Sequence, residues 1–562
     1  MKKRLLAWLL ILVMVLSFTA CGSKEEAPSA QEEIKAEAPK EEIDNKQVEE
    51  IKVDAEENSN FNPTGYPVVN EPVTLTIMAP ITSERGGDWE TNTAWKELEE
   101  VTGVKLELIT VDANEWKEKL SLTLASGKLP DIILDIPANT AVRGLTEQDL
   151  YKNVSIGNFI DLTPYIEAYG VNVKKYMDTM EGFTQSITTP SGEIASLPVM
   201  QMMTEKGKCP ISLLTVNQPW LDKLGLDIPT TDVEFYEMLK AFKEQDPNGN
   251  GLQDEIPILA LNVDRFYELW GMFGVLVQQN NYAYTVGEEV KFSPFMPEFK
   301  VGLEYMAKLY QEGLIDPNIY TTTAAEVLAT GSGEVDVCGV TIHGAAFAVV
   351  GEERNLVHSL IPELDAEGYD GVWLSRTPST AGAFMITKDC EYPEIALRVW
   401  DYMYSEEGGK LSWMGPEENY TWNDDGTWNW NLAEGETVES VRATKTLQTS
   451  FAPGCSFPQD WFKQNNPTEG IANEYRVLMG TEYADNLRLV CPNFAFDEEV
   501  AKELSIIKTD LDNYVNTTIA QFITGELDIE ADWAAFEKQC QSLRVDEYIS
   551  IMQDAYDVYL GK

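Results

Sequence analysis

In the first part of the globular chain, hydrophobic residues recur at two spacings, and segments with the spacing of a strand alternate with segments that have the spacing of a helix. A period of two over residues 73–77 and 104–108 predicts strands, and apolar residues at helical spacing over 95–101 and 116–124 predict helices. The short apolar run at 130–135 is typical of a buried strand. Strands and helices in this alternating order favour a parallel sheet with helices on its faces, which is an α/β fold.

The same patterns continue towards the C-terminus. The final part of the chain is predicted to be helical, because apolar residues hold one face from Val500 to Phe522. Ligands of α/β sheets bind beyond the carboxyl ends of the strands. We therefore expect loops of a binding site at 81–89 and 135–140. Further strands are predicted at 211–216, 335–340 and 381–387.

The N-terminus has the order of a secretory signal. Residues 1–20 begin with basic side chains, continue with an apolar run too short to span a bilayer and end with small residues. Residues 17–22 resemble a bacterial lipobox, so we expect cleavage before Cys21 and a lipid on that residue; the alternative is an ordinary signal with an incidental cysteine. Residues 21–70, rich in Glu, Lys, Ala and Pro, are predicted to be a disordered acidic tether.

Composition narrows the possible partners and chemistry. A formal net charge of −51 over 562 residues repels phosphate backbones, so we expect no nucleic-acid partner. Six cysteines follow Cys21 without metal spacing, which leaves disulfides and buried free thiols both open. His343 and His358 are the only histidines, and no Ser/His/Asp cluster can be nominated, so we predict that the protein is not an enzyme.

One run has a spacing that indicates a chemistry. From Asp246 onward, oxygen-bearing side chains fall at the first, third, fifth and ninth positions, with Gly251 at the sixth, which is the ligand order of a calcium loop. An EF-hand has a Glu at the twelfth position, where this chain has Pro257. The alternative is a metal-free surface turn, and either role is structural. The expected Ca²⁺ ligands are Asp246, Asn248, Asn250, Asp254, the carbonyl of Leu252 and the carboxylate of Glu255.

The order of these features resembles the substrate-binding subunits of bacterial ABC sugar importers. These extracellular solute-binding proteins include the maltose- and alginate-oligosaccharide-binding proteins. The alginate-binding members carry a similar calcium loop with an adjacent Asp-Glu pair, which would explain the role of Glu255. The resemblance covers most of residues 73–562 and rests on the lipobox, on segments 220–225 and 246–257, and on the C-terminal segments 528–533 and 548–556.

The resemblance implies a type II periplasmic-binding-protein fold, in which two α/β lobes joined by a hinge close over a ligand. By analogy, the first lobe would comprise residues 73–208 plus 356–404. The second lobe would comprise residues 212–350 plus 405–562. The calcium loop would then brace the second lobe away from the ligand.

Sugar sites combine flat aromatic rings with carboxylates, amides and guanidinium groups, because sugars present apolar faces and many hydroxyls. Candidates of these types fall in predicted loops or helix starts near the lobe edges. For each of them, ordinary core or surface packing is the alternative. The candidate ligand-binding residues are Arg85, Trp89, Trp270, Trp373, Tyr420 and Trp422.

These features together predict a monomeric substrate-binding lipoprotein of an ABC importer, anchored at the outer face of the cell membrane. It would capture an oligosaccharide and deliver it unaltered to the permease. A membrane-tethered glycoside-active enzyme and a polysaccharide-binding adhesion module are the alternatives. The net negative charge of the chain disfavours a polyanionic ligand, although Arg or Lys side chains at the binding site could reverse this preference.

Overall fold

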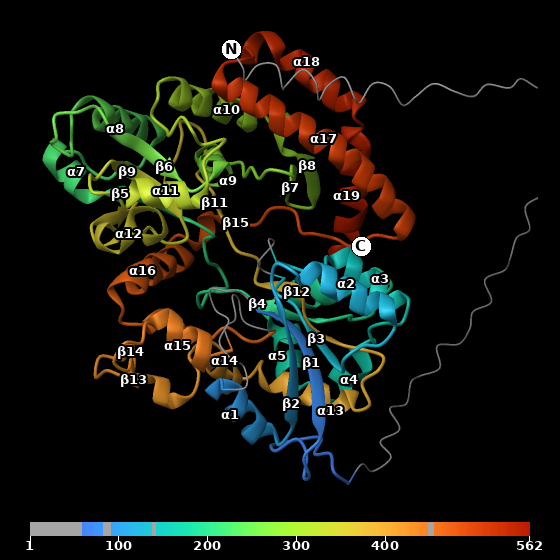
Figure 1. Ribbon diagram of the computed structural model, residues 1–562. Coiled ribbons are helices and arrows are strands. Elements are labelled where there is room, and N and C mark those ends of the chain that lie inside the picture. Colours follow the sequence, from blue (N-terminus) through green and yellow to red (C-terminus); the bar gives the residue numbers. More distant parts are fainter. Residues whose placement is uncertain (1–58, 82–90, 138–141, 181, 363, 448–453) are drawn as a thin grey trace, which may run out of the picture. The chain divides into compact units, whose positions relative to one another are not determined.

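The computed structural model describes residues 59–81, 91–137, 142–180, 182–362, 364–447 and 454–562. This part contains a five-stranded and a four-stranded sheet, each with its own hydrophobic core (Figure 1). The signal at 1–20, Cys21 and most of the tether at 21–70 lie outside the described residues. Within the described ranges, no helix combines the length and the apolar character needed to cross a membrane.

The five-stranded sheet, sheet 1, has the order β2-β1-β3-β12-β4. β1 is parallel to β2 and β3, whereas β12 runs antiparallel to β3 and β4. The strand-helix-strand order predicted for residues 73–135 is confirmed. The strands are β1 (Thr74–Ile81), β2 (Lys105–Asp112), β3 (Ile132–Leu134), β4 (Leu197–Met200) and β12 (Ser379–Ile386).

Helices bury apolar faces in the core of sheet 1. In α1 the side chain of Asn92 caps the first turn, Trp95 and Leu98 are buried, and Gly103 ends the helix with φ 74°. A positive φ suits glycine because it has no Cβ. The helices beside this sheet are α1 (Thr93–Thr102), α2 (Trp116–Ser126), α3 (Glu147–Ser155), α4 (Thr163–Tyr169), α5 (Val171–Thr179), α6 (Phe183–Ile187) and α13 (Pro393–Tyr402).

The four-stranded sheet, sheet 2, has the order β10-β5-β9-β6. β6 and β9 are parallel, and β5 is antiparallel to β9 and to β10. The Asn/Gly/Asp-rich loop leads directly into a strand, because β6 begins at Ile256. The strands are β5 (Leu213–Asn217), β6 (Ile256–Ala260), β9 (Cys338–His343) and β10 (His358–Leu360).

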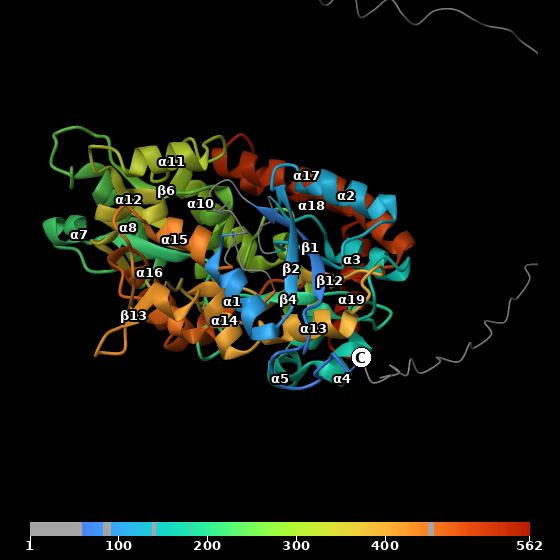
Figure 2. The ribbon, with the colours of Figure 1, turned by 60° about the horizontal axis from the view of Figure 1, so that its bottom comes forward.

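Most of the remaining helices share the hydrophobic core of sheet 2. α10 and α17 lie side by side in both views (Figures 1 and 2), and Gln311 at the end of α10 donates to the carbonyl of Ile523 in α17. The long C-terminal helix and the shorter helices after it are confirmed. These helices are α7 (Gln218–Leu224), α8 (Asp232–Glu244), α9 (Val263–Tyr267), α10 (Pro297–Gln311), α11 (Ala324–Gly331), α12 (Phe347–Asn355), α16 (Pro467–Thr481), α17 (Glu498–Thr524), α18 (Ile529–Ser542) and α19 (Val545–Tyr559).

The two cores divide the sequence differently from the ranges expected for the lobes. β10, within the range 356–404, pairs with β5 of sheet 2, since its short strand follows α12 directly. Trp413, Trp428 and Trp461, within the range 405–562, belong to the core of sheet 1. The elements between α13 and α16 are α14 (Glu406–Trp413), η3 (Glu417–Asn419), β13 (Tyr420–Trp422), β14 (Trp428–Trp430), α15 (Val438–Lys445) and η4 (Gln459–Lys463).

Segments 209–211 and 374–376 connect the strands of one sheet to those of the other, and segment 487–488 runs beside them. The backbone N–H of Arg376 donates to the carbonyl of Cys209 at 2.8 Å, and Ile211 donates to Leu374 at 2.9 Å. Ser375 donates to Arg488 at 2.7 Å, and β11 (Trp373–Leu374) pairs with β15 (Leu487–Arg488) (Figure 1). We call these three segments, 209–211, 374–376 and 487–488, the crossing segments. The other short elements are β7 (Ala283–Val286), β8 (Glu289–Phe292), η1 (Glu268–Phe273), η2 (Ser293–Phe295) and η5 (Ala484–Asn486).

Candidate functional site

Both sheets connect to the crossing segments at the edge where their parallel strands end. In sheet 1, β4 ends at Met200, which pairs with Ser379, the first residue of β12. In sheet 2, β9 ends at His343, which pairs with Leu213, the first residue of β5. This carboxyl edge is where α/β sheets bind ligands. The connectivity therefore brings both ligand-binding edges to the crossing segments.

Asp135 organises the carboxyl edge of sheet 1. It follows β3 directly, is 1% exposed and accepts hydrogen bonds from Trp116 Nε1 at 2.7 Å and from the backbone of Gly144 and Leu145 at 2.8 and 2.9 Å. Burial raises the pKa of Asp135, and these hydrogen bonds oppose the rise. The carboxylate thus holds residues 144–145 against β3 and shapes the loop that follows the strand.

Arg265, Glu268 and Ser212 form a polar group at the carboxyl edge of sheet 2. Asn262 caps α9 just after β6, and this cap places Arg265 in the first turn of the helix. Arg265 Nη1 lies 2.5 Å from Glu268 Oε1 and donates to Ser212 Oγ at 2.8 Å. Burial raises the pKa of Glu268, and the Arg265 charge opposes this rise.

Two further arginines, Arg376 and Arg476, lie beside the same edge. Arg376 belongs to a crossing segment, and Arg476 lies on α16 and donates from Nη2 to the carbonyl of Gly344 at 2.7 Å. Burial, together with the positive charges of Arg265, Arg476 and Arg376, lowers the pKa of His343 to about 4. His343 is therefore a neutral imidazole at pH 7.

Trp270 does not suit the ligand contact expected for it. The side chain is fully buried, its ring stacks on Phe299 at 5.1 Å between centroids, and Nε1 donates to the carbonyl of Phe299 at 2.9 Å. Its helical spacing places it on an inward face, so core packing explains this residue. Trp373 is also buried, at 5% exposure, on the crossing strand β11.

Tyr420 and Trp422 are brought together on the β13–β14 hairpin. Their ring centroids are 6.3 Å apart, Trp422 is 42% exposed, and Lys463 Nζ lies 5.9 Å from the centre of the Trp422 ring. An exposed indole beside a second ring is a surface on which a sugar face can stack. Two other candidates, Arg85 and Trp89, lie outside the described residues.

The Asn/Gly/Asp-rich loop at 246–255 is a compact turn between α8 and β6. Asp246 accepts from the backbone N–H of Gly249 and Gly251 at 2.9 and 3.1 Å, and the side-chain amides of Asn248 and Asn250 lie 2.9–3.0 Å from the carboxylate of Asp254. Both carboxylate oxygens of Glu255 are buried without a hydrogen-bond donor among the described residues. In that same part of the chain, no three His, Cys, Asp or Glu side chains gather closely enough to hold a metal by themselves.

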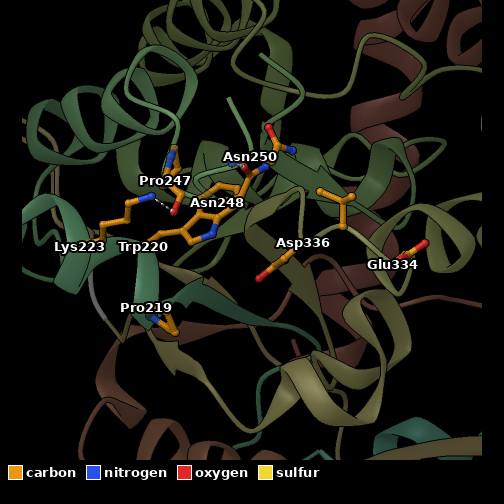
Figure 3. Close-up of a pocket in the computed structure, with 9 residues that line it drawn as sticks. Pro219, Trp220, Lys223, Pro247, Asn248, Asn250, Glu334 and Asp336 are labelled. Carbon is orange, nitrogen blue, oxygen red and sulfur yellow. Dashed lines mark hydrogen bonds between the residues drawn. The ribbon is translucent and has the colours of Figure 1, made fainter. Parts of the chain in front are cut away.

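A pocket of about 490 Å³ lies beside this loop (Figure 3). Lys223 points towards the loop and donates to the carbonyl of Pro247 at 2.9 Å, and Asp336 lines the other side (Figure 3). The pocket and the loop lie before β6 and β9, at the amino edge of sheet 2. They are thus at the opposite edge from His343, where a sugar is expected. The lining residues are Pro219, Trp220, Lys223, Pro247, Asn248, Asn250, Glu334, Val335 and Asp336.

The structure decides between the two possibilities left open for the cysteines. The six that follow Cys21 are free thiols, and five of them are buried. Burial raises the pKa of Cys390, Cys455, Cys491 and Cys540 to about 12, so these thiols stay protonated and unreactive at neutral pH.

Sequence reasoning missed the arginines at the carboxyl edge of sheet 2. Arg265 lies three residues after Asn262, which caps α9, and a capping residue after an apolar run is a local signal. Arg376 and Arg476 come from distant segments, and only the tertiary fold brings them near His343. A single sequence carries no pattern that joins such positions.

The fold and the position of these groups define a class of protein that holds a solute at the carboxyl edges of two sheets. The profile of the bacterial extracellular solute-binding protein family matches residues 83–410. The chain therefore belongs to this family. It is a substrate-binding protein of ABC transport and not an enzyme.

The particular relatives include an ABC transporter substrate-binding protein and a lipoprotein. The chain is 25% identical over 494 residues to the fructooligosaccharide ABC transporter substrate-binding protein FusA of Streptococcus pneumoniae serotype 4, covering 82% of this chain and 86% of FusA. It is 28% identical over 260 residues to the lipoprotein LipO of Bacillus subtilis, covering 45% of this chain and 47% of LipO.

Solved structures share the fold. FusA in complex with kestose superposes with a TM-score of 0.69 at 22% identity, covering 87% of this chain and all of FusA. A second structure is of a FusA EF-hand mutant in complex with fructo-nystose, with the same TM-score and coverage. The alginate-binding protein AlgQ2 without calcium ion gives a TM-score of 0.63 at 21% identity, covering 88% of this chain and all of AlgQ2. These likenesses confirm the type II periplasmic-binding-protein fold.

Proposed function

We propose that this protein is the lipid-anchored receptor of an ABC importer that captures an oligosaccharide and passes it intact to the permease. The observation that carries the proposal is the meeting of both carboxyl edges at the crossing segments, because a ligand held there touches both sheets. The similarity to FusA over most of both chains supports a sugar as the solute. The tethered enzyme and the adhesion module have no comparable support.

We propose two lobes divided at the crossing segments. The first would hold sheet 1 and the Trp-rich segment around β13 and β14, since Trp413, Trp428 and Trp461 pack in that core. The second would hold sheet 2, including β10, and the helices from α16 to α19. Segments 209–211 and 374–376, which pass from one lobe to the other, can act as a hinge, because a few backbone torsions there would move one lobe as a rigid body.

Aromatic rings are proposed to stack on the sugar. Tyr420 and Trp422 are the described pair with an exposed indole, and Arg85 and Trp89 remain proposals at the carboxyl end of β1. Trp373, buried on a crossing segment, is proposed to position its neighbours rather than to touch the sugar.

A structural Ca²⁺ is proposed for the loop at 246–255. The chemistry of the loop fits the ion, since Glu255 has two buried oxygens without a donor and its pKa is raised by burial and by the nearby charges of Asp254 and Asp246. Asp246, Asn248, Asn250, Asp254, Glu255 and the Leu252 carbonyl would supply hard oxygen ligands. Amide and carbonyl oxygens are essential to this set, because the carboxylates alone do not form a metal cluster in the described residues.

The membrane attachment is proposed from Cys21 and the acidic tether. A lipid on Cys21 would keep the monomeric receptor beside the permease at the outer face of the membrane. Globomycin, which blocks lipoprotein signal cleavage, should cause a precursor retaining residues 1–20 to accumulate. Secretion of a soluble form cleaved after another residue would remove the anchor from the proposal.

The receptor function is tested with a panel of oligosaccharides. A receptor raises its melting temperature with the right sugar, because the ligand binds only the folded state. Uptake of that sugar by cells should stop when the partner permease is deleted, even though the receptor is still present. Uptake that continues without any ABC permease would contradict the proposal.

A further inference from the structure

Three arginines from separate parts of the chain lie at the carboxyl edge of sheet 2, around His343 and Gly344. Arg476 Nη2 donates to the carbonyl of Gly344 at 2.7 Å, and Arg376 Nη2 lies 3.7 Å from the point that a Cβ on Gly344 would occupy. Arg265, from α9, reaches the same edge and donates to Ser212 Oγ at 2.8 Å. Two guanidinium groups thus lie beside Gly344, and the third, that of Arg265, is close enough to lower the pKa of the neighbouring His343.

Carboxylates accompany two of these arginines, and Asp264 as well as Glu268 lies close to Arg265. Glu268 pairs with Arg265 at 2.5 Å, whereas Glu469 stands 3.9 Å from Arg476 and is equally distant from Arg442. Arg376 has no ion pair within the described residues. An arginine without a carboxylate partner is unexpected in a chain with a net charge of −51, because acidic residues are abundant in its sequence.

The guanidinium groups also have unused donors. The Nε–H groups of Arg265, Arg376 and Arg476 are buried, and each lacks a hydrogen-bond partner within the part of the chain that the structure describes. Burial lowers the pKa of Arg376, and the charges of Arg476 and Arg265 lower it further. Unpaired buried charge is costly, so it is usually retained where a ligand neutralises it.

Part of the cluster is accessible and lies where a solute is expected, whereas the Arg476 side chain is 8% exposed. Arg265 is 26% exposed, and Arg376, His343 and Gly344 are also partly exposed. The neutral imidazole of His343 adds no further positive charge at pH 7. Arg376 belongs to a crossing segment, so the charge faces the region that both carboxyl edges share.

We propose that the Arg265, Arg376 and Arg476 cluster binds an oxyanionic group of the captured oligosaccharide, so that the natural solute is an acidic sugar. Guanidinium forks match the planar geometry of a carboxylate and also bind sulfate esters. A uronic-acid carboxylate and a sugar sulfate present the same chemistry to the cluster. This inference rests on the proposed receptor function and names its substrate class. The net negative charge of the chain argues against an acidic ligand, but the positive charge of the arginines at the site determines which ligand binds there.

The test compares sugars that differ only in charge. The full mature protein is titrated by calorimetry with oligosaccharides of galacturonic, glucuronic or mannuronic acid, each beside its carboxyl-reduced neutral counterpart, and with neutral and sulfated forms of one oligosaccharide. We expect at least one acidic sugar to bind about tenfold or more tightly than its neutral counterpart, because a charge-assisted hydrogen bond contributes about that much to the affinity. The two sets of acidic sugars distinguish a carboxylate from a sulfate.

Arg376→Gln connects this preference to the cluster. Arg376 is chosen because it has no ion pair to lose within the described residues, and we expect the variant to bind the acidic sugar and its neutral counterpart equally. Arg544→Gln is the control, since it removes an exposed arginine of α19 that pairs with Glu503 and Glu547. If Arg376→Gln does not fold, the charge dependence is tested with wild-type protein at increasing salt concentration. Salt should weaken the binding of the acidic sugar and leave the binding of the neutral sugar unchanged.

The outcomes separate this inference from the proposed function. Tight binding of a neutral sugar with no gain from charge and no effect of Arg376→Gln overturns the oxyanion site and leaves the receptor function in place. Failure to bind any sugar in the panel overturns both. Charge-dependent binding that persists unchanged in Arg376→Gln also overturns the assignment to this cluster.

Discussion

Replacing Glu255 by Gln should change stability in opposite directions with and without calcium. Without metal, the Glu255 carboxylate is buried, has no donor among the described residues and stands near Asp246 and Asp254. Its raised pKa means that folding disfavours the ionised form, so removing the charge at pH 7 should leave stability unchanged or raise it by up to about 1 kcal/mol.

With calcium the order should reverse. An extracellular calcium module with a Kd of about 10⁻⁴ M is stabilised by about 2.7 kcal/mol in about 10 mM calcium. Losing the carboxylate ligand and about 100-fold in affinity would leave the variant about 0.4 kcal/mol of this gain. The wild type should therefore exceed Glu255→Gln by about 1–2 kcal/mol in calcium and not in chelator.

The assay is denaturant unfolding at pH 7, in about 10 mM calcium and in EGTA. Glu237→Gln, an exposed position on α8, is the control and should respond to calcium as the wild type does. A difference between wild type and Glu255→Gln that has the same sign and size in both conditions would refute the calcium loop. The calcium loop would also be refuted if the wild type had the same free energy of unfolding in calcium and in EGTA.

Other predictions follow from single contacts. Asp135→Ala should lower the free energy of unfolding by about 3 kcal/mol or more, because Trp116 Nε1 and backbone N–H groups lose a buried acceptor, whereas Asp178→Ala should have little effect. Burial lowers the pKa of His358 to about 4, so as the pH falls below about 6.5 the unfolded chain takes up a proton before the folded one does. The free energy of unfolding of the wild type, relative to that of His358→Gln, should therefore fall by about 1.4 kcal/mol per pH unit between about pH 6.5 and pH 4. It should stay constant above about pH 6.5. Trp422→Ala should weaken sugar binding several-fold with little change in melting temperature, because the indole is 42% exposed; unchanged affinity would remove it from the site. In a form of the protein that lacks Cys21, a thiol reagent should label six cysteines, and it should do so only after the protein is unfolded. Fewer than six labelled cysteines would indicate a disulfide.

The sequence predicted the elements better than their grouping. Residues 73–135 and the helix through Val500 follow regular periods, and the structure has those elements. β9 lies at 338–343 rather than 335–340, because the polar residue Asp336 pairs with Arg354 before the strand begins. The sequence does not show that the Trp-rich segment packs in the core of sheet 1, because periodicity indicates that a tryptophan is buried and not against which sheet it packs.

The candidate site was partly predictable for the same reason. Spacing alone picked out the loop at 246–255, because its groups are neighbours in sequence. Trp270 and Trp422 have similar side chains, but the first is in the core and the second is exposed, and this difference arises only from tertiary packing. Arg376 and Arg476 are 100 positions apart, so their convergence on Gly344 is a property of the fold.

The most direct test of the account is recovery of the captured solute. Purified receptor is incubated with an oligosaccharide that raises its melting temperature, washed free of unbound sugar and unfolded, and the released sugar is weighed by mass spectrometry. The account predicts one sugar molecule for each protein chain, with its mass unchanged after prolonged incubation. Release of shorter fragments, or of no sugar at all, would contradict it.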